Sequence, residues 1–125
     1  MGLVTTHEDL EIFKLSFEAS NIIFYKTQKF PRDERYSLTD QIRRSSRSVS
    51  ANLAEAFIKR KYPKLFVSKL IDVEGEAAET QVWIKYAREY GYLEEPMSIH
   101  LHSVYHSIIS MAIQMSKNSE KWAIR

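Results

Sequence analysis

The sequence predicts an all-α protein, an antiparallel up-down-up-down four-helix bundle. Only three glycines and three prolines interrupt its 125 residues, which indicates long regular elements. Apolar residues recur at steps of three and four along four stretches, as in helices that bury one face. Helices of roughly 20 residues are about 30 Å long, and short links force neighbouring helices to be antiparallel. We expect one domain over residues 1–125, with helices at about 8–30, 34–60, 63–90 and 95–117.

The first helix is predicted by an aromatic stripe that stops before a proline. Its members are Leu10, Phe13, Phe17, Ser20 and Phe24. Pro31 ends this helix, because a proline pushes the residue before it out of the helical region.

The second helix combines an apolar stripe with several small residues. The stripe consists of Leu38, Ile42, Ser45, Val49, Asn52 and Ala56, with Leu53 and Phe57 beside it. Asp33 or Ser37 can cap its N-terminus. The small residues would let a neighbouring helix approach closely.

The third helix has a heptad-like stripe and one internal glycine. Pro63 suits its first turn, and the stripe is Phe66, Leu70, Val73, Ala77, Thr80, Ile84 and Ala87. Gly75 inside it costs roughly 1 kcal/mol relative to alanine. We therefore expect Gly75 to mark a close contact between helices.

A glycine and a proline separate the third helix from the fourth. Gly91 predicts a left-handed C-terminal cap, after which Tyr92 and Leu93 fold back onto the helix. The fourth helix then begins near Pro96, and its stripe is Met97, Leu101, Val104, Ile108, Met111 and Met115.

More apolar residues are present than four inward stripes can use. The additional ones are Ile12, Ile22, Ile23, Leu65, Val67, Ile71, Val82, Trp83, Tyr86 and Tyr90. Either they widen the core, or they form a surface for self-association, since most soluble oligomers are homomeric.

Composition excludes several classes of protein. The chain has no cysteine, so disulfides, thiolate metal sites and thiol nucleophiles are absent. It has neither a signal-peptide pattern nor 18 consecutive apolar residues. We expect a soluble, cytoplasmic protein that does not associate with a membrane.

Positive charge is concentrated in the second helix and the link after it. Residues 26–69 hold 12 Lys/Arg and 4 Asp/Glu, residues 70–100 hold 2 and 7, and the net charge is only +2. The candidate nucleic-acid-binding residues are Arg43, Arg44, Arg47, Lys59, Arg60, Lys61 and Lys64. Such a surface could follow phosphates, with an affinity that falls as salt rises. The alternative is a solvated face, on which Asp40 pairs with Arg44 and Glu55 with Lys59.

Asn52 lies on the apolar stripe of the second helix, so its amide needs partners if it is buried. We interpret it as a structural polar contact that fixes helix register, rather than as a ligand-binding group. Glu55, one turn away, can help to satisfy it.

Catalytic and metal-binding patterns are weak or missing. His102 and His106, four residues apart, could hold part of a metal site, but no third ligand is evident, and surface histidines explain the pair better. The sequence contains no Gly-rich phosphate loop, Gly-x-Ser-x-Gly elbow, His-Glu-x-x-His, or Glu-x-x-His of di-iron bundles. We expect no enzymatic activity, no metal and no cofactor.

Five segments resemble a known bacterial family. They are Asp9–Lys14, Phe30–Ser45, Ala51–Ala56, Ala78–Gln81 and Gly91–Leu93. They resemble the four-helix-bundle family named for proteins encoded in intervening sequences of 23S rRNA genes, over about residues 8–115. The family pattern carries over at Gln41, Ile42, Arg43, Arg44, Asn52, Ala54 and Glu55. The chain departs from it at Ser50, where the family often has proline, and at Ala56, where it usually has glycine.

The resemblance implies a ring or barrel of subunits, a homopentamer in known relatives, without established catalytic activity. The family is also similar to the accessory subunit of diversity-generating reverse transcriptases, a basic barrel that binds nucleic acid and the polymerase. We therefore expect a non-enzymatic homo-oligomer that binds RNA or DNA through its basic surface, with Gln41, Asn52 and Glu55 as structural polar residues. The alternative is an interaction scaffold or accessory subunit that docks a reverse transcriptase or other partner without touching nucleic acid.

Overall fold

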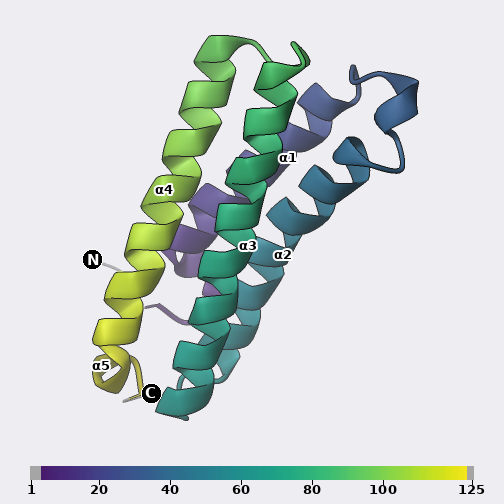
Figure 1. Ribbon diagram of the computed structural model, residues 1–125. Helices are drawn as coiled ribbons and strands as arrows, with labels where there is room; N and C mark the ends of the chain where they lie inside the picture. The colour runs from purple at the N-terminus through teal and green to yellow at the C-terminus, as the bar shows by residue number, and fades with distance from the viewer. Residues whose placement is uncertain (1–3, 124–125) are drawn as a thin grey trace.

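The computed structural model describes residues 4–123, which form four long helices and three short ones. The long helices are α1 (Glu11–Thr27), α2 (Leu38–Ile58), α3 (Pro63–Glu89) and α4 (Glu95–Lys117). They run alternately up and down, and α1 closes the bundle against α4 (Figure 1). The short elements are η1 (His7–Asp9), η2 (Arg32–Glu34) and α5 (Ser119–Ala123). The predicted all-α helical bundle is confirmed.

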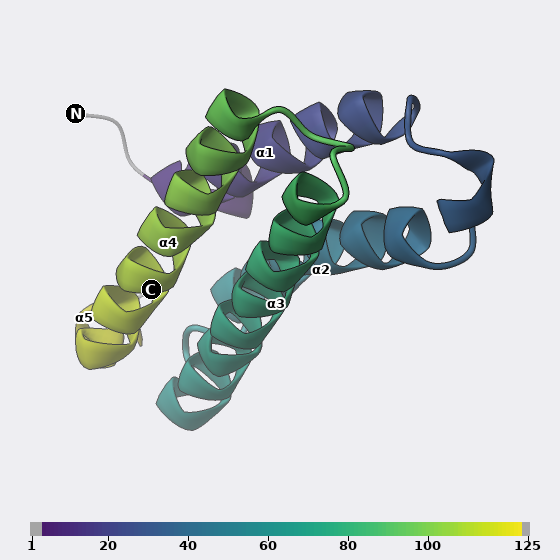
Figure 2. The same ribbon diagram turned by 45° about the horizontal axis from the view of Figure 1, so that its top comes forward.

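The four long helices do not pack equally. α3 packs extensively on both α2 and α4, whereas α1 meets α4 over a shorter length. α1 lies behind α3 and α4 in the view of Figure 1, and Figure 2 shows that it is inclined to them. Among residues 4–123, no helix combines the length and apolar character that crossing a bilayer requires.

The core stripes of α2 and α3 follow the sequence pattern. On α3, every predicted stripe residue from Phe66 to Ala87 is buried. On α2, the predicted residues are buried except Asn52, which is half-buried at the margin of the core. The Thr80 hydroxyl donates a hydrogen bond to Ser45 Oγ at 2.8 Å inside this interface.

The face that α1 buries differs from the predicted one. Its buried residues are Ile12, Ser16, Ala19, Ile23 and Thr27. Phe17 is 54% exposed, and Phe13 and Phe24 are half-buried at the rim. Small side chains let α2 come close, with Ser16 Oγ 2.9 Å from Ser50 Oγ, whereas a row of phenylalanines would hold the two helices apart.

α4 also buries a face slightly different from the predicted one. The buried residues are Ser98, Leu101, Tyr105, Ile108 and Ala112. The predicted Val104 and the three methionines are half-buried and pack at the edges of the core. Tyr105 is fully enclosed, and burial raises the pKa of its phenol.

The link between α1 and α2 is ordered by Phe30 and Glu34. Phe30 turns into the core, with its ring 5.3 Å from that of Tyr92. Glu34 Oε1 accepts hydrogen bonds from Ser37 Oγ (2.7 Å) and the Leu38 amide (3.3 Å), and Oε2 accepts one from the Tyr92 hydroxyl (2.9 Å). Ser37 occupies the N-cap position without a side-chain capping bond, so Glu34 caps α2 in place of the predicted Asp33 or Ser37.

The two glycines of the α3 region have different roles. Gly91 has φ 77°, and the Tyr92 amide donates to the Ala87 carbonyl, as the predicted cap requires. Gly75 lies on the outer face of α3, where an added Cβ would meet no atom of the described residues within 4 Å. The prediction that Gly75 contacts another helix is therefore wrong within a single chain.

The additional apolar residues divide between the core and the surface. Ile12 and Ile23 are core residues, so they widen the core. The side chains that remain exposed on α3 are Leu65, Ile71, Val82, Tyr86 and Tyr90.

Replacing Ile23 by alanine should lower the free energy of unfolding by about 2 to 5 kcal/mol, because it leaves a cavity between α1 and the core. Phe17→Ala should cost about 1 kcal/mol or less, because most of this ring is in solvent. Denaturant unfolding followed by circular dichroism, at one protein concentration, measures both. A larger loss for Phe17→Ala would mean that α1 buries the other face.

Candidate nucleic-acid interface

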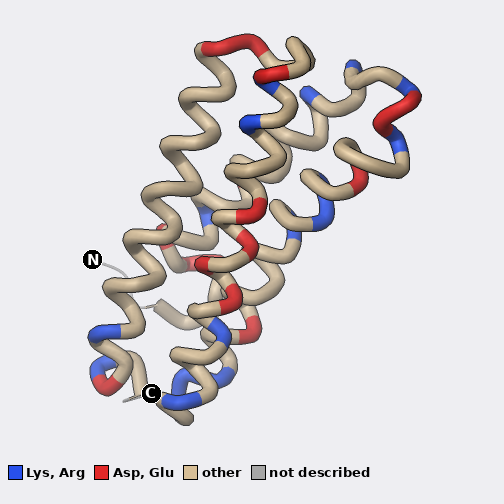
Figure 3. The backbone as a smooth tube through the Cα atoms, viewed as in Figure 1, with Lys and Arg blue, Asp and Glu red and all other residues tan. Residues whose placement is uncertain are grey.

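The seven candidate basic residues lie in three different environments. Arg43 and Arg47 are on the side of α2 next to α1, Arg44 is on the side next to α3, and the remaining four are near the link between α2 and α3. Consecutive helical residues are about 100° apart, so Arg43 and Arg44 must diverge. Figure 3 shows acidic positions along the middle of α3 and basic positions gathered at the end that contains the α2–α3 link and α5.

Arg43 is half-buried and contacts α1. Its Nε donates to Thr27 Oγ1 at 2.8 Å, one terminal nitrogen lies 3.4 Å from the Phe24 carbonyl, and the guanidinium stands 4.8 Å from the Phe24 ring centroid. Burial, with a smaller contribution from Arg47, lowers the pKa of Arg43. Arg43 therefore joins α1 to α2 and presents only part of its charge to solvent.

Arg44 lies in an acidic setting. Its nearest carboxylate is Asp40, at 3.9 Å across one helical turn. On α3, burial and the charges of Glu79 and Asp72 raise the pKa of Glu76, and Arg44 opposes that shift. The alternative of a locally paired, solvated side chain therefore describes Arg44 well.

Arg47 is exposed beside the aromatic side chains of α1. Its guanidinium lies 5.8 Å from the Phe24 ring centroid. Within residues 4–123 it has no carboxylate within ion-pairing distance. Of the three arginines, Arg47 is the one best placed to meet an external phosphate.

The end of the bundle near the α2–α3 link carries several exposed lysines. Lys59 lies 3.9 Å from Glu55, and Lys61 and Lys64 are exposed. Arg60 folds onto Phe57, 3.8 Å from its ring centroid, and donates to the Phe57 carbonyl at 2.7 Å. Lys121, which sequence reasoning did not single out, comes to the same end through α5.

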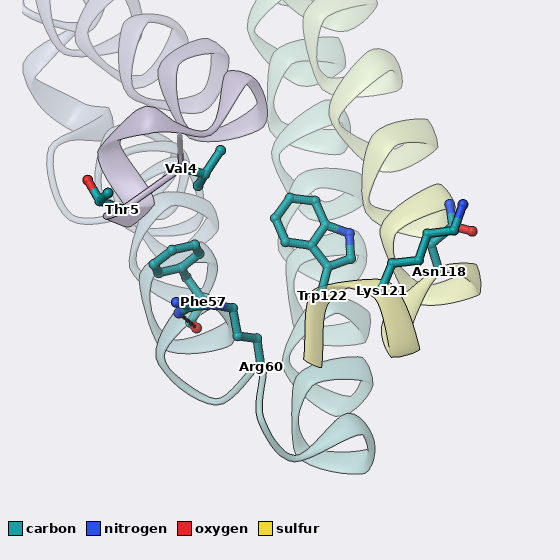
Figure 4. A pocket seen from close by; sticks show the side chains of 7 residues that line it. All are labelled: Val4, Thr5, Phe57, Arg60, Asn118, Lys121 and Trp122. Carbon is teal, nitrogen blue, oxygen red and sulfur yellow. Dashed lines mark hydrogen bonds between the residues drawn. The ribbon is translucent and has the colours of Figure 1, made fainter. Parts of the chain in front are cut away.

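A pocket of about 710 Å³ opens beside this end of the bundle (Figure 4). Val4, Phe57 and Trp122 give it a largely apolar wall, and Arg60 lines one side. In Figure 4 the Lys121 side chain extends away from Phe57. The pocket thus combines aromatic surface with one guanidinium that is already bound to a carbonyl.

Asn52 and Glu55 make polar contacts between α2 and α3. Asn52 Nδ2 donates to the Ser48 carbonyl (2.9 Å) and hydroxyl (3.0 Å), and its Oδ1 lies 3.4 Å from Lys69 Nζ. Lys69 also pairs with Glu55 at 3.0 Å and Asp72 at 3.6 Å. The hydrogen bond from Lys69 lowers the pKa of Glu55, and the same bond raises the pKa of Lys69. Lys69 is thus the shared partner, which could have been recognised from its position on the inner edge of the α3 stripe.

The remaining candidates lie on open surface. Gln41 is exposed on α2. His102 and His106 are both exposed on α4. In the described part of the chain, no group of three or more His, Cys, Asp or Glu side chains could hold a metal ion.

Comparison with known proteins identifies relatives of the whole bundle. The family model described as 23S rRNA-intervening sequence protein matches residues 8–114. A solved structure of a protein of unknown function from the S23 ribosomal protein family, from Bacteroides thetaiotaomicron, superposes with a TM-score of 0.75 at 22% identity, covering 85% of this chain and 95% of that one. At this identity the likeness shows the fold alone. No curated protein matches this chain.

Arg43→Ala should lower the free energy of unfolding by about 1 to 3 kcal/mol, because it removes a charged hydrogen bond and a cation–π contact that join α1 to α2. Arg47→Ala should change it by about 0.5 kcal/mol or less. Thermal and denaturant unfolding of the two variants measure the difference. Equal losses would contradict the structural role of Arg43.

Glu55 should make stability depend on pH in the acid range. Its pKa is lower in the folded chain, so its ion pair stabilises the fold above the ordinary glutamate pKa, and this stabilisation disappears as pH falls through the folded value. The stability difference between wild type and Glu55→Gln should therefore shrink between about pH 6 and about pH 3. A constant difference over that range would exclude the ion pair as its cause.

Proposed function

Because this chain belongs to the family of 23S rRNA-intervening sequence proteins, we propose that it is a non-enzymatic, homo-oligomeric bundle that binds RNA or DNA backbones in the bacterial cytoplasm. The separation of charge carries this proposal. Acids on α3 and α2 neutralise Arg44 and Lys69, whereas Arg47, Arg60 and Lys64 have no ion pair within residues 4–123.

A phosphate backbone suits the basic end of the bundle. Lys61 and Lys64 are exposed on the link and the first turn of α3, and Lys121 reaches the same end from α5. Lysine side chains that bind phosphates release counterions from a nucleic acid, whatever its base sequence. The binding expected from this surface is thus dependent on salt and tolerant of sequence.

Self-association is supported by an open apolar strip on α3. Its members are Ile71, Gly75, Ala78, Val82 and Tyr86, all exposed and spaced at three or four residues. Gly75 leaves room for another helix to come close, and no side chain or backbone of residues 4–123 fills that room. A ring of subunits joined through this strip, the pentamer that the family resemblance implies, would bring several basic ends together.

The second candidate function is an interaction scaffold or accessory subunit that docks a polymerase, such as a reverse transcriptase, without direct nucleic-acid contact. The same strip favours it, because exposed apolar surface of this kind serves a partner as well as a second copy. In that case the basic residues contribute solubility.

Binding of a structured RNA hairpin and a DNA duplex, followed by fluorescence anisotropy across salt, tests the first proposal. The logarithm of the binding constant should fall linearly with the logarithm of the salt concentration. The double variant Lys61→Ala and Lys64→Ala should reduce the magnitude of this slope by about 2, roughly one for each lost phosphate contact. Lys85→Ala, an exposed site on α3, is the matched control and should leave the slope unchanged.

No binding at low salt would reject nucleic-acid binding and favour the scaffold. Binding without a salt dependence would reject binding of the phosphate backbone by this basic surface. Light scattering of the same samples reports the number of subunits, and a lone monomer would remove the assembly part of the proposal.

A further inference from the structure

A polar hollow of about 300 Å³ lies where the α1–α2 link meets α2. Three arginines line it, Arg32 and Arg35 from the link and Arg43 from α2, and no carboxylate is among its lining residues in the described chain. The nearby Glu34 is occupied by Ser37, Leu38 and Tyr92. Guanidinium groups without a competing carboxylate match the fork geometry and charge of a phosphate.

Arg43 is held rigidly at the edge of this hollow. Its bonds to Thr27 and the Phe24 carbonyl use two of its five N–H donors, which leaves donors for an anion. A fixed guanidinium loses little side-chain entropy when it binds.

A second hollow, of about 380 Å³, continues along the same two helices. Phe13 and Phe17 of α1 form its aromatic side, with ring centroids 5.9 Å apart and planes 15° from parallel. Asn21 and Arg47 line it as well. The Phe17 ring is more than half exposed, so it offers a flat apolar face next to a cation.

Phe24 lies between one arginine of each hollow. The guanidinium of Arg43, which lines the first hollow, and that of Arg47, which lines the second, both stand against its ring, at 4.8 and 5.8 Å from the centroid. From Thr39 to Ala54 the lining residues of the two hollows extend about 22 Å along α2. Arginines and phenylalanines thus alternate along the α1–α2 groove, in which the two hollows lie one after the other on either side of Phe24.

We propose that this groove binds a single-stranded polynucleotide, with phosphates on Arg32, Arg35 and Arg43 and an unpaired base stacked on Phe17. The proposal rests on the nucleic-acid-binding function and specifies its place and strandedness. Stacking on aromatic side chains beside a basic groove is how proteins hold single strands. A duplex keeps its base faces inside the stack, so it gains nothing from Phe17.

Anisotropy titrations with oligo(U), oligo(dT) and a duplex of equal length test this inference. Phe17→Ala should weaken single-strand binding by roughly 5- to 150-fold and leave duplex binding unchanged. Phe17→Tyr, which keeps a stacking ring, should retain single-strand affinity. Arg35→Ala should weaken binding and reduce the salt slope by about 1. Tyr90→Ala, an exposed aromatic site at the end of α3 outside both hollows, is the control and should have no effect.

The outcomes separate this inference from the proposed function. One outcome is that wild type and Phe17→Ala bind single strands equally well, while duplex binding depends on salt and still requires Lys61 and Lys64. This outcome overturns the binding of single strands in the groove and leaves the proposed function intact. No binding of any probe overturns both. A changed oligomer mass for Phe17→Ala overturns the inference, because the groove would then bind a second copy of this chain. Binding of polyglutamate that is equally strong and also needs Phe17 overturns it as well, because the groove would then bind an acidic polypeptide. Preference for oligo(U) or oligo(dT) over the duplex supports it.

Discussion

The buried stripe from Phe66 to Ala87 on α3 fixes the positions of the other long helices. Its side chains fill the space between α2 and α4, and the Thr80–Ser45 hydrogen bond sets the register of α2 inside that interface. Once the inner face of α2 is committed to α3, the directions of its remaining side chains follow from helix geometry. The chemistry of the protein surface therefore depends on how α2 packs against α3.

The division of positive charge is the main consequence. Arg43 turns toward α1, where Thr27 and Phe24 hold it, and Arg44 turns toward the acids of α3. A run that looks uniform in sequence is therefore divided into a structural arginine, a paired arginine and, at Arg47, an exposed one. The charge available to a ligand lies in the α1–α2 groove and at the end that carries Lys61 and Lys64.

α1 has a second apolar face that remains exposed in the folded protein. This helix is apolar on two sides, and the close approach that Ser16 and Ala19 permit decides which side goes inward. The phenylalanines on the other side of α1 are not buried in the core and remain at its rim, next to the arginines of α2. When α1 buries its small residues against α2, its large residues remain at the surface. The close helix packing and the aromatic surface of the proposed binding groove therefore have the same cause.

The sequence by itself determined the helical class, the breaks at Pro31, Pro63 and Gly91, and the core stripes of α2 and α3. These features depend on local backbone preferences and on faces with a single apolar stripe, which need no knowledge of neighbours. Only the tertiary structure decided the inward face of α1, the open position of Gly75 and the separate environments of Arg43, Arg44 and Arg47. Side-chain size and charge across a helix interface settle those questions, and the residues involved meet only when the chain folds.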